Sequence, residues 1–147
     1  MTTYQARPRR IRFVAIAGAV FFVVVFTVIA LLLKKSSTGV FFKTSDQLAM
    51  IGIGVVLAAA TLVIMRPSVR ADDEGIEVRN LLGWQRYEWE LVRSISFPDK
   101  AWWARVELPD YEYVPVMAIQ AFDGVRAVEA MRELRRLHRA YQQRAAG

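Results

Sequence analysis

Two long apolar runs near the start of the chain dominate its pattern of hydrophobic and polar positions. Residues 13–33 (FVAIAGAVFFVVVFTVIALLL) contain no charged side chain, and as a helix they would span about 31 Å, close to the thickness of a bilayer's hydrocarbon core. Residues 48–65 are also uncharged and would span about 27 Å as a helix. We therefore expect a membrane hairpin, with helices at 13–33 and 48–65, within an N-terminal part that covers residues 1–67.

After Pro67 the pattern changes to short alternations of apolar and polar residues. Turn residues separate these alternations at 72–75, 80–83, 98–100 and 109–110. Trp89 falls in a predicted strand at 84–89, Leu91 in another at 91–97, and Tyr111 in the last one. No crossover helix interrupts the strands, so we expect an antiparallel sandwich or barrel across residues 69–119.

A helix over residues 123–143 ends the chain. Asp123 is the expected N-cap. An apolar stripe at helical spacing follows, made of Ala127, Ala130, Met131, Leu134, Leu137 and Tyr141. We expect this stripe to close the open end of the barrel. The predicted fold class is a membrane α-hairpin plus an α+β domain, residues 68–147, with a PH-like antiparallel β-sandwich or barrel capped by a C-terminal amphipathic helix.

Several segments of this domain resemble a known family. They are residues 70–80 (RADDEGIEVRN), residues 82–89 (LGWQRYEW) and the Phe122-Asp123-Gly124 entry to the helix with its Leu134 and Leu137. The chain resembles the bacterial PH (pleckstrin-homology-like) domains of small actinobacterial membrane proteins, in which the domain commonly follows a two-helix hairpin. The resemblance implies a fold and brings no catalytic motif.

The charge is distributed unevenly along the chain. Its formal net charge is +6, and residues 1–67 hold eight Lys and Arg residues against Asp46 alone. The folded domain thus lacks the basic footprint of a nucleic-acid binder, and we expect no nucleic-acid partner. The first apolar run is longer than a signal peptide's core, which favours an uncleaved anchor. Arginines flank the hairpin on its outer sides, and three lysines lie in its loop, so we expect a multi-pass protein of the inner (plasma) membrane with both termini cytoplasmic.

The sequence offers little chemistry. It has no cysteine and one histidine, His138, so thiolate and multi-histidine metal sites are excluded. Asp72, Asp73 and Glu74 are adjacent acids in a tight turn, which is typical of a solvated turn rather than a catalytic pair. They would also repel a phosphoinositide headgroup at the position where eukaryotic PH domains bind it. We expect no catalytic residues, no cofactor and no metal, and hence no enzyme.

Two sets of residues are candidates for contacts. The lipid-headgroup candidates are Arg7, Arg9, Arg10, Arg12, Arg66 and Arg70. The protein-partner candidates are Trp102, Trp103, Tyr111 and Tyr113, although one of the tryptophans could instead be an interface anchor. We expect an adaptor or accessory subunit that binds a protein partner near the bilayer. The alternatives are a sensor of anionic lipid or of the membrane surface without phosphoinositide specificity and, third, a small membrane enzyme.

Overall fold

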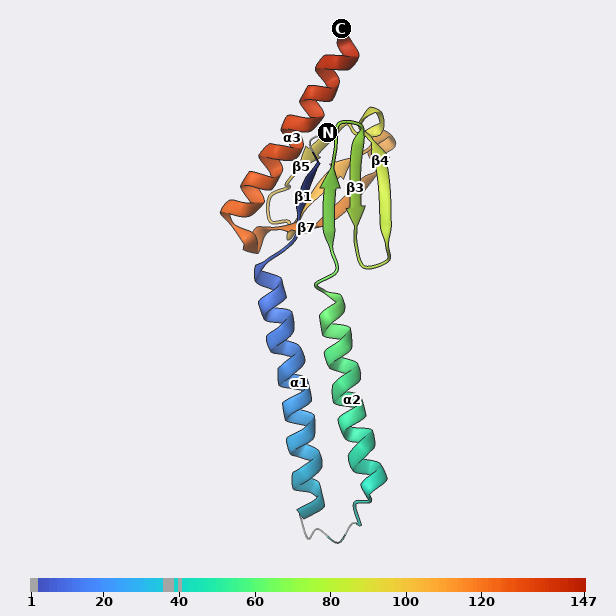
Figure 1. Cartoon of the computed structure of the whole chain (residues 1–147), viewed down its shortest axis with the longest axis vertical. Helices are drawn as coiled ribbons and strands as arrows, with labels where there is room; N and C mark the ends of the chain where they lie inside the picture. Colours follow the sequence, from blue (N-terminus) through green and yellow to red (C-terminus); the bar gives the residue numbers. More distant parts are fainter. Residues whose placement is uncertain (1–2, 36–38, 40) are drawn as a thin grey trace. The chain divides into compact units, whose positions relative to one another are not determined.

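The structure is a computed structural model of the chain, and it describes residues 3–35, 39 and 41–147. The chain forms two compact units (Figure 1). One unit contains residues 11–65. The other combines residues 1–10 with residues 66–147, and we call it the β domain.

The first unit consists of helices α1 (Arg10–Lys35) and α2 (Thr44–Val63), and both are long and apolar enough to cross a membrane. The two predicted helices are confirmed, with different ends. Helix α1 takes in polar residues on both sides of the apolar run. Helix α2 begins earlier than predicted because the Asp46 carboxylate accepts a hydrogen bond of 3.0 Å from the N–H of Lys43. Residues 36–38 and 40 of the predicted loop lie outside the described residues.

The contact between α1 and α2 is built on small residues. Gly54 is buried, and a Cβ added there would lie 2.7 Å from Phe26 Cβ and 3.2 Å from the Phe22 carbonyl oxygen. A Cβ at Gly18 would lie 3.2 Å from Thr61 Cγ2. Small side chains allow this close approach in an apolar environment, where no hydrophobic force drives helices together.

The β domain contains two antiparallel sheets and a long helix. The first sheet has the order β1-β2-β3-β4, and the second has the order β5-β6-β7. The strands are β1 (Tyr4–Ala6), β2 (Ser68–Ala71), β3 (Gly75–Arg79), β4 (Trp84–Glu88), β5 (Ser94–Ser96), β6 (Trp103–Glu107) and β7 (Tyr113–Gln120). Three short 3-10 turns, η1 (Trp89–Leu91), η2 (Pro109–Tyr111) and η3 (Ala121–Asp123), interrupt them, and α3 (Val125–Ala146) ends the chain.

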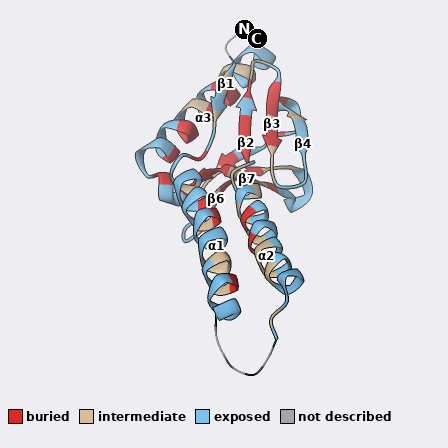
Figure 2. Ribbon diagram, turned by 60° about the horizontal axis from the view of Figure 1, so that its bottom comes forward, coloured by how far each residue is buried: buried red, intermediate tan, exposed pale blue. Residues whose placement is uncertain are grey.

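The core of the β domain lies between the sheets and α3 (Figure 2). Five members of the predicted stripe on α3 are buried, and the sixth, Tyr141, is half-buried against them. Alternation in β6 buries Ala104 and Val106, as the sequence predicts. The PH-like arrangement of antiparallel sheets closed by a C-terminal helix is therefore confirmed.

The sequence did not predict strand β1. Tyr4 pairs with Ala71 and Ala6 with Val69, so β1 adds a fourth strand to the first sheet. Residues 1–10 consequently group with the β domain, whereas their sequence predicts that they belong with the hairpin in residues 1–67. A segment of only three residues, next to a run of arginines, is too short to show the alternation of apolar and polar residues that predicts a strand. Strand β1 is stabilised only by its pairing with β2.

Four local expectations need correction. Trp89 leaves β4 and begins η1, because its side chain turns into the core. Of the strand predicted at 91–97, only Ser94–Ser96 pairs, and Leu91 is half exposed. Tyr111 lies in η2 rather than in a strand. Asp123 belongs to η3 and does not cap α3, whose N-cap is Gly124 with a φ of 56°.

Candidate interaction surfaces

The register of the first sheet brings two chain connections and one turn to the same end. Ala6 pairs with Val69, Ser68 pairs with Arg79, and Arg79 pairs with Trp84. The chain leaves β1 at this end toward α1 and enters β2 here from α2. The β3–β4 turn is at this end as well. We call it the helix-proximal end of the sheet, and the opposite end holds the β2–β3 turn and η1.

The six arginines predicted to contact lipid do not share one environment. Arg7, Arg9, Arg12 and Arg66 are exposed. Arg10 is engaged within the β domain: its backbone N–H donates to Asp123 Oδ1 at 3.2 Å, and its Nη1 donates to the Phe122 carbonyl oxygen at 3.0 Å. Arg70 is exposed on β2, with its guanidinium 4.7 Å from the centre of the Trp84 ring. Arg10 is therefore a structural residue as well as a surface charge.

The four aromatic residues predicted to bind a partner are divided between two places. Trp102 and Trp103 lie where β6 begins, and Tyr111 and Tyr113 lie beyond its other end, since Trp103 pairs with Gln120 and Glu107 with Tyr113. Tyr111 is 97% exposed, and Tyr113 carries the Arg105 guanidinium 4.3 Å from its ring centre. A five-residue strand separates the pairs by about 15 Å, so they form two separate groups of aromatic side chains.

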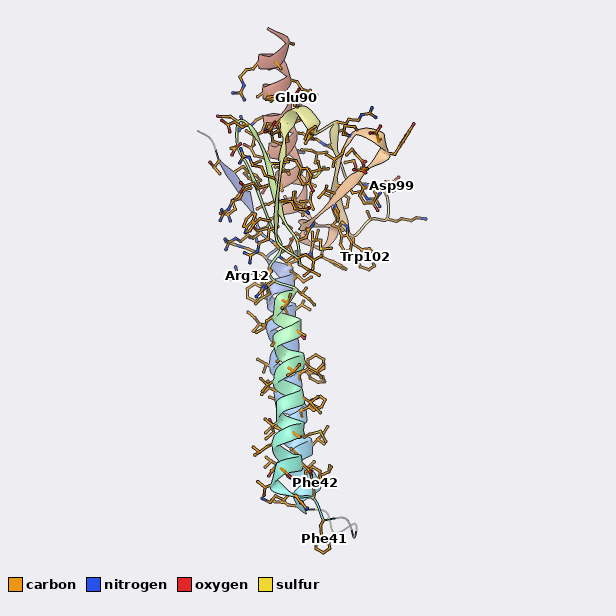
Figure 3. The ribbon with its side chains drawn as sticks, turned by 90° about the vertical axis from the view of Figure 1, so that its right-hand side faces the viewer. Arg12, Phe41, Phe42, Glu90, Asp99 and Trp102 are labelled. Carbon is orange, nitrogen blue, oxygen red and sulfur yellow. The ribbon has the colours of Figure 1, made fainter. Side chains whose placement is uncertain are left out.

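Trp102 is the more informative of the two tryptophans (Figure 3). It is 62% exposed, whereas Trp103 is half-buried in β6. The Trp102 ring lies 5.4 Å from the ring of Phe122, which is 58% exposed. The prediction that one of the two tryptophans is exposed is confirmed, although Trp102 lies just before β6 and not in the strand. We call Trp102 and Phe122 the aromatic pair.

An apolar groove adjoins the aromatic pair. It has a volume of about 470 Å³ and runs between the end of β5 and the start of α3. The backbone N–H of Ala121 in its wall donates to the Trp102 carbonyl oxygen at 3.0 Å. On the other side, Arg135 Nε donates to the Ile95 carbonyl oxygen at 3.0 Å. The groove is lined by Phe97, Ala121, Gly124, Ala127, Val128, Met131, Arg132 and Arg135. The groove is not apparent from the sequence, because its residues come from segments far apart in the chain.

The acidic β2–β3 turn is internally paired. Arg86 on β4 forms ion pairs with Asp72 at 3.2 Å, Glu74 at 3.3 Å and Glu77 at 3.1 Å. The backbone N–H groups of Glu74 and Gly75 each donate to Asp72 Oδ1 at 2.9 Å. Burial opposes ionisation of Asp72, but these N–H groups and Arg86 outweigh it and lower the pKa of Asp72 below its usual 3.8. These interactions stabilise the structure of the turn. The positive charge of Arg86 also reduces the repulsion of an anionic headgroup that three unpaired acidic side chains would cause.

His138 is part of the core packing. It is buried, its Nε2 lies 2.9 Å from the Val92 carbonyl oxygen, and its ring lies 5.3 Å from that of Trp89. Among the residues that the structure describes, no group of three His, Cys, Asp or Glu side chains is placed to hold a metal ion.

These features define a PH-like β domain preceded by two candidate membrane helices. Residues 66–137 match the family model described as Bacterial PH domain. The uncharacterized protein Rv1417 of Mycobacterium tuberculosis (strain H37Rv) is 47% identical over 135 residues, which cover 92% of this chain and 88% of the relative. The uncharacterized protein Mb1452 of Mycobacterium bovis matches with the same identity and coverage. No solved structure shows significant similarity. The chain belongs to the bacterial PH domain family and has actinobacterial relatives, as its sequence indicates.

Proposed function

We propose that this protein is an integral membrane protein whose PH-like domain acts as a non-enzymatic adaptor or accessory subunit, binding a protein partner beside the bilayer. In this proposal α1 and α2 cross the inner membrane, and both termini are cytoplasmic. The arginine-rich outer flanks support that orientation. Anchoring confines the domain to the membrane surface, which raises its effective concentration toward a partner held there.

The observation that carries the adaptor proposal is the aromatic pair beside the apolar groove. Trp102 and Phe122 are both more than half exposed, and the half-exposed Val128 lines the nearby groove together with Arg135. Tryptophan, phenylalanine and arginine are residue types enriched at the centres of protein interfaces. An exposed apolar surface of this kind, rimmed by charges, is typical of a contact site.

Site-specific photocrosslinking tests the adaptor proposal in the native membrane. A photoreactive amino acid replaces Val128, which is half exposed in the groove wall, or Tyr111, which is fully exposed near the far end of β6. We expect a discrete protein adduct from position 128 that the Trp102→Ala substitution weakens, and none of that size from position 111. Equal adducts from both positions, or no effect of Trp102→Ala, would contradict the proposed surface.

The orientation has its own test. A reporter that works only in the cytoplasm should be active when it is fused after Gly147, and a reporter that works only in the periplasm should be inactive there. The reason is that the flanking arginines favour a cytoplasmic location for both termini. A periplasmic signal from this fusion would contradict the proposed topology, whatever the result of the crosslinking.

A second candidate function is contact with anionic lipid, without phosphoinositide specificity. The hydrogen bond from Arg10 to the Phe122 carbonyl oxygen favours it, because it places the aromatic pair beside the first residue of α1. Tryptophan is enriched at membrane interfaces. In the photocrosslinking experiment this function would yield lipid adducts from position 128 in place of a protein adduct.

A further inference from the structure

The C-terminal helix α3 has two flanks of different charge beside its buried stripe. One flank lies toward β1, where burial and the charges of Glu133 and Glu129 raise the pKa of Tyr4. The other flank lies toward β5, because Arg135 Nε donates to the Ile95 carbonyl oxygen at 3.0 Å. Residues three and four positions apart share one face of a helix. On the β5 side these residues, which we call the basic flank, are Val128, Arg132, Arg135 and Arg139.

The three arginines of the basic flank are exposed and have no acidic partner in the described part of the chain. Ion pairs between described residues use only Arg86, Arg136 and Arg144 as their cations. Both glutamates of α3 lie on the opposite flank. Arg139 Nε donates to the Arg135 carbonyl oxygen within the same helix. Like charges three and four residues apart repel one another, so carboxylates of another molecule would relieve this repulsion.

The basic flank continues the apolar groove beside the aromatic pair. Val128, Arg132 and Arg135 belong to both, since they also line the groove. Arg139 follows about one helical turn after Arg135, and the flank extends over about 16 Å from Val128 to Arg139. Along this length an apolar surface gives way to a row of cations. All of these residues belong to the β domain.

The nearby edge of β5 is not free to pair with an added strand. Helix α3 packs against β5 (Figure 1). Arg135 Nε occupies the Ile95 carbonyl oxygen, and His138 Nε2 lies 2.9 Å from the Val92 carbonyl oxygen just before the strand. A partner must therefore bind this surface through its side chains. An amphipathic helix laid in a groove binds in this way, through residues three and four positions apart.

We propose that the partner of this adaptor docks an acidic amphipathic helix on the groove and the basic flank. Apolar side chains of that helix fill the groove and contact Trp102 and Val128. Its carboxylates, spaced about one turn apart, pair with Arg132, Arg135 and Arg139. The proposal rests on the adaptor function and adds the chemistry of the partner. Opposite charges across an interface favour the correct partner, and like charges disfavour basic competitors.

Two synthetic peptides of opposite charge test this proposal on the full chain. Each has about 18 residues, enough to form a helix, with leucines on one face and either glutamates or lysines beside them. The chain is reconstituted in phosphatidylcholine nanodiscs, and fluorescence anisotropy of the labelled peptide measures binding, with empty nanodiscs as the blank. We expect the glutamate peptide to bind at least thirtyfold more tightly than the lysine peptide, since each of three exposed ion pairs contributes roughly threefold.

Matched removals of charge from the two flanks of α3 locate the contact. Arg132→Gln with Arg139→Gln should weaken binding of the glutamate peptide about tenfold, because two ion pairs are lost. Arg135 is kept, because it also bonds to β5. Arg126→Gln with Arg136→Gln removes the same charge from exposed positions of the opposite flank and should leave binding nearly unchanged. Thermal melting of both variants verifies that each retains its fold.

The outcomes separate the charge of the partner from the adaptor function itself. If both peptides bind equally and Trp102→Ala abolishes binding, the contact surface stands and the acidic partner is wrong. No binding of the glutamate peptide, or an equal loss from both pairs of substitutions, would also overturn the proposal. Photocrosslinking from position 128 in native membranes decides the adaptor function separately, because it assumes nothing about the charge of the partner.

Anionic lipid is the other molecule that could supply negative charge to the basic flank. In nanodiscs that contain one quarter phosphatidylglycerol, a photoreactive amino acid at position 128 would then form a lipid adduct. Loss of that adduct in the chain with Arg132→Gln and Arg139→Gln would assign the basic flank to lipid and overturn the proposed partner. We expect no lipid adduct that depends on these two arginines.

Discussion

The indole Nε1 of Trp89 donates a hydrogen bond of 2.8 Å to the carbonyl oxygen of Asp72. The backbone N–H of Trp89 also donates to the Glu74 carbonyl oxygen at 3.1 Å, and its ring packs against His138 of α3. One buried residue thus joins the β2–β3 turn, η1 and the C-terminal helix. This is why the chain turns inward after β4 instead of continuing as a strand.

Substitutions of Trp89 should separate its hydrogen bond from its packing. Trp89→Phe keeps much of the ring and leaves the Asp72 carbonyl oxygen without its partner, which should cost about 1–2 kcal/mol of unfolding free energy. Trp89→Ala should cost about 3–5 kcal/mol, because it also opens a cavity. Pulse proteolysis of the full chain in mild detergent across a denaturant series measures both. The control is Trp102→Phe at an exposed site, and a comparable loss there would contradict the interpretation.

Periodicity predicted the elements of this fold well and their ends less well. The apolar runs at residues 13–33 and 48–65 and the stripe on α3 are long, so each signal is repeated over several turns. The predictions for Trp89 and Asp123 were wrong because the roles of these residues depend on partners far away in the sequence. Asp123 accepts a hydrogen bond from the backbone N–H of Arg10, and local sequence patterns do not reveal a pair separated by so much of the chain. The aromatic pair and its groove could not be predicted for the same reason. The exposure of one of the two adjacent tryptophans was predicted correctly, although Trp102 lies outside the strand that the argument assumed.

Asp123 should stabilise the β domain through the start of α1. Its carboxylate accepts from the backbone N–H of Arg10, one of the first helical N–H groups, which lack a partner inside the helix. Asp123→Ala should therefore reduce the unfolding free energy by about 0.5–2 kcal/mol, and Asp123→Asn should retain most of it, since the amide oxygen still accepts. Asp99→Ala, at an exposed site, is the control in the same proteolysis assay. If the Asn and Ala variants lose equal stability, the hydrogen bond is not the cause.

The acidic turn predicts a pH dependence of stability. The pKa of Asp72 is lowered in the folded state, so its ionised form stabilises the fold above its unfolded pKa of about 3.8, and this contribution is lost as the pH falls through the lower folded value. Asp72→Asn should therefore have a lower Tm than the natural chain at pH 7. The two Tm values should converge as the pH falls below about 4. A difference that stays constant from pH 7 to below 4 would mean that the charge of Asp72 is not what stabilises the turn.

Strand β1 should be required for full stability of the β domain. Tyr4 and Ala6 pack against the core, and β1 pairs with three consecutive residues of β2, leaving β2 as an open edge when it is absent. A fragment of residues 66–147 should unfold with about 1–2 kcal/mol less free energy than the domain in the full chain, mainly from the lost burial of Tyr4. Joining residues 3–8 to the fragment through a flexible linker should restore that stability. The same linker carrying Tyr4→Ser should not restore it, because the strand would then lack the side chain that packs on the core. Full stability of the bare fragment would show that β1 pairs with the edge of the sheet without stabilising the domain. The domain would then fold independently of its N-terminal strand.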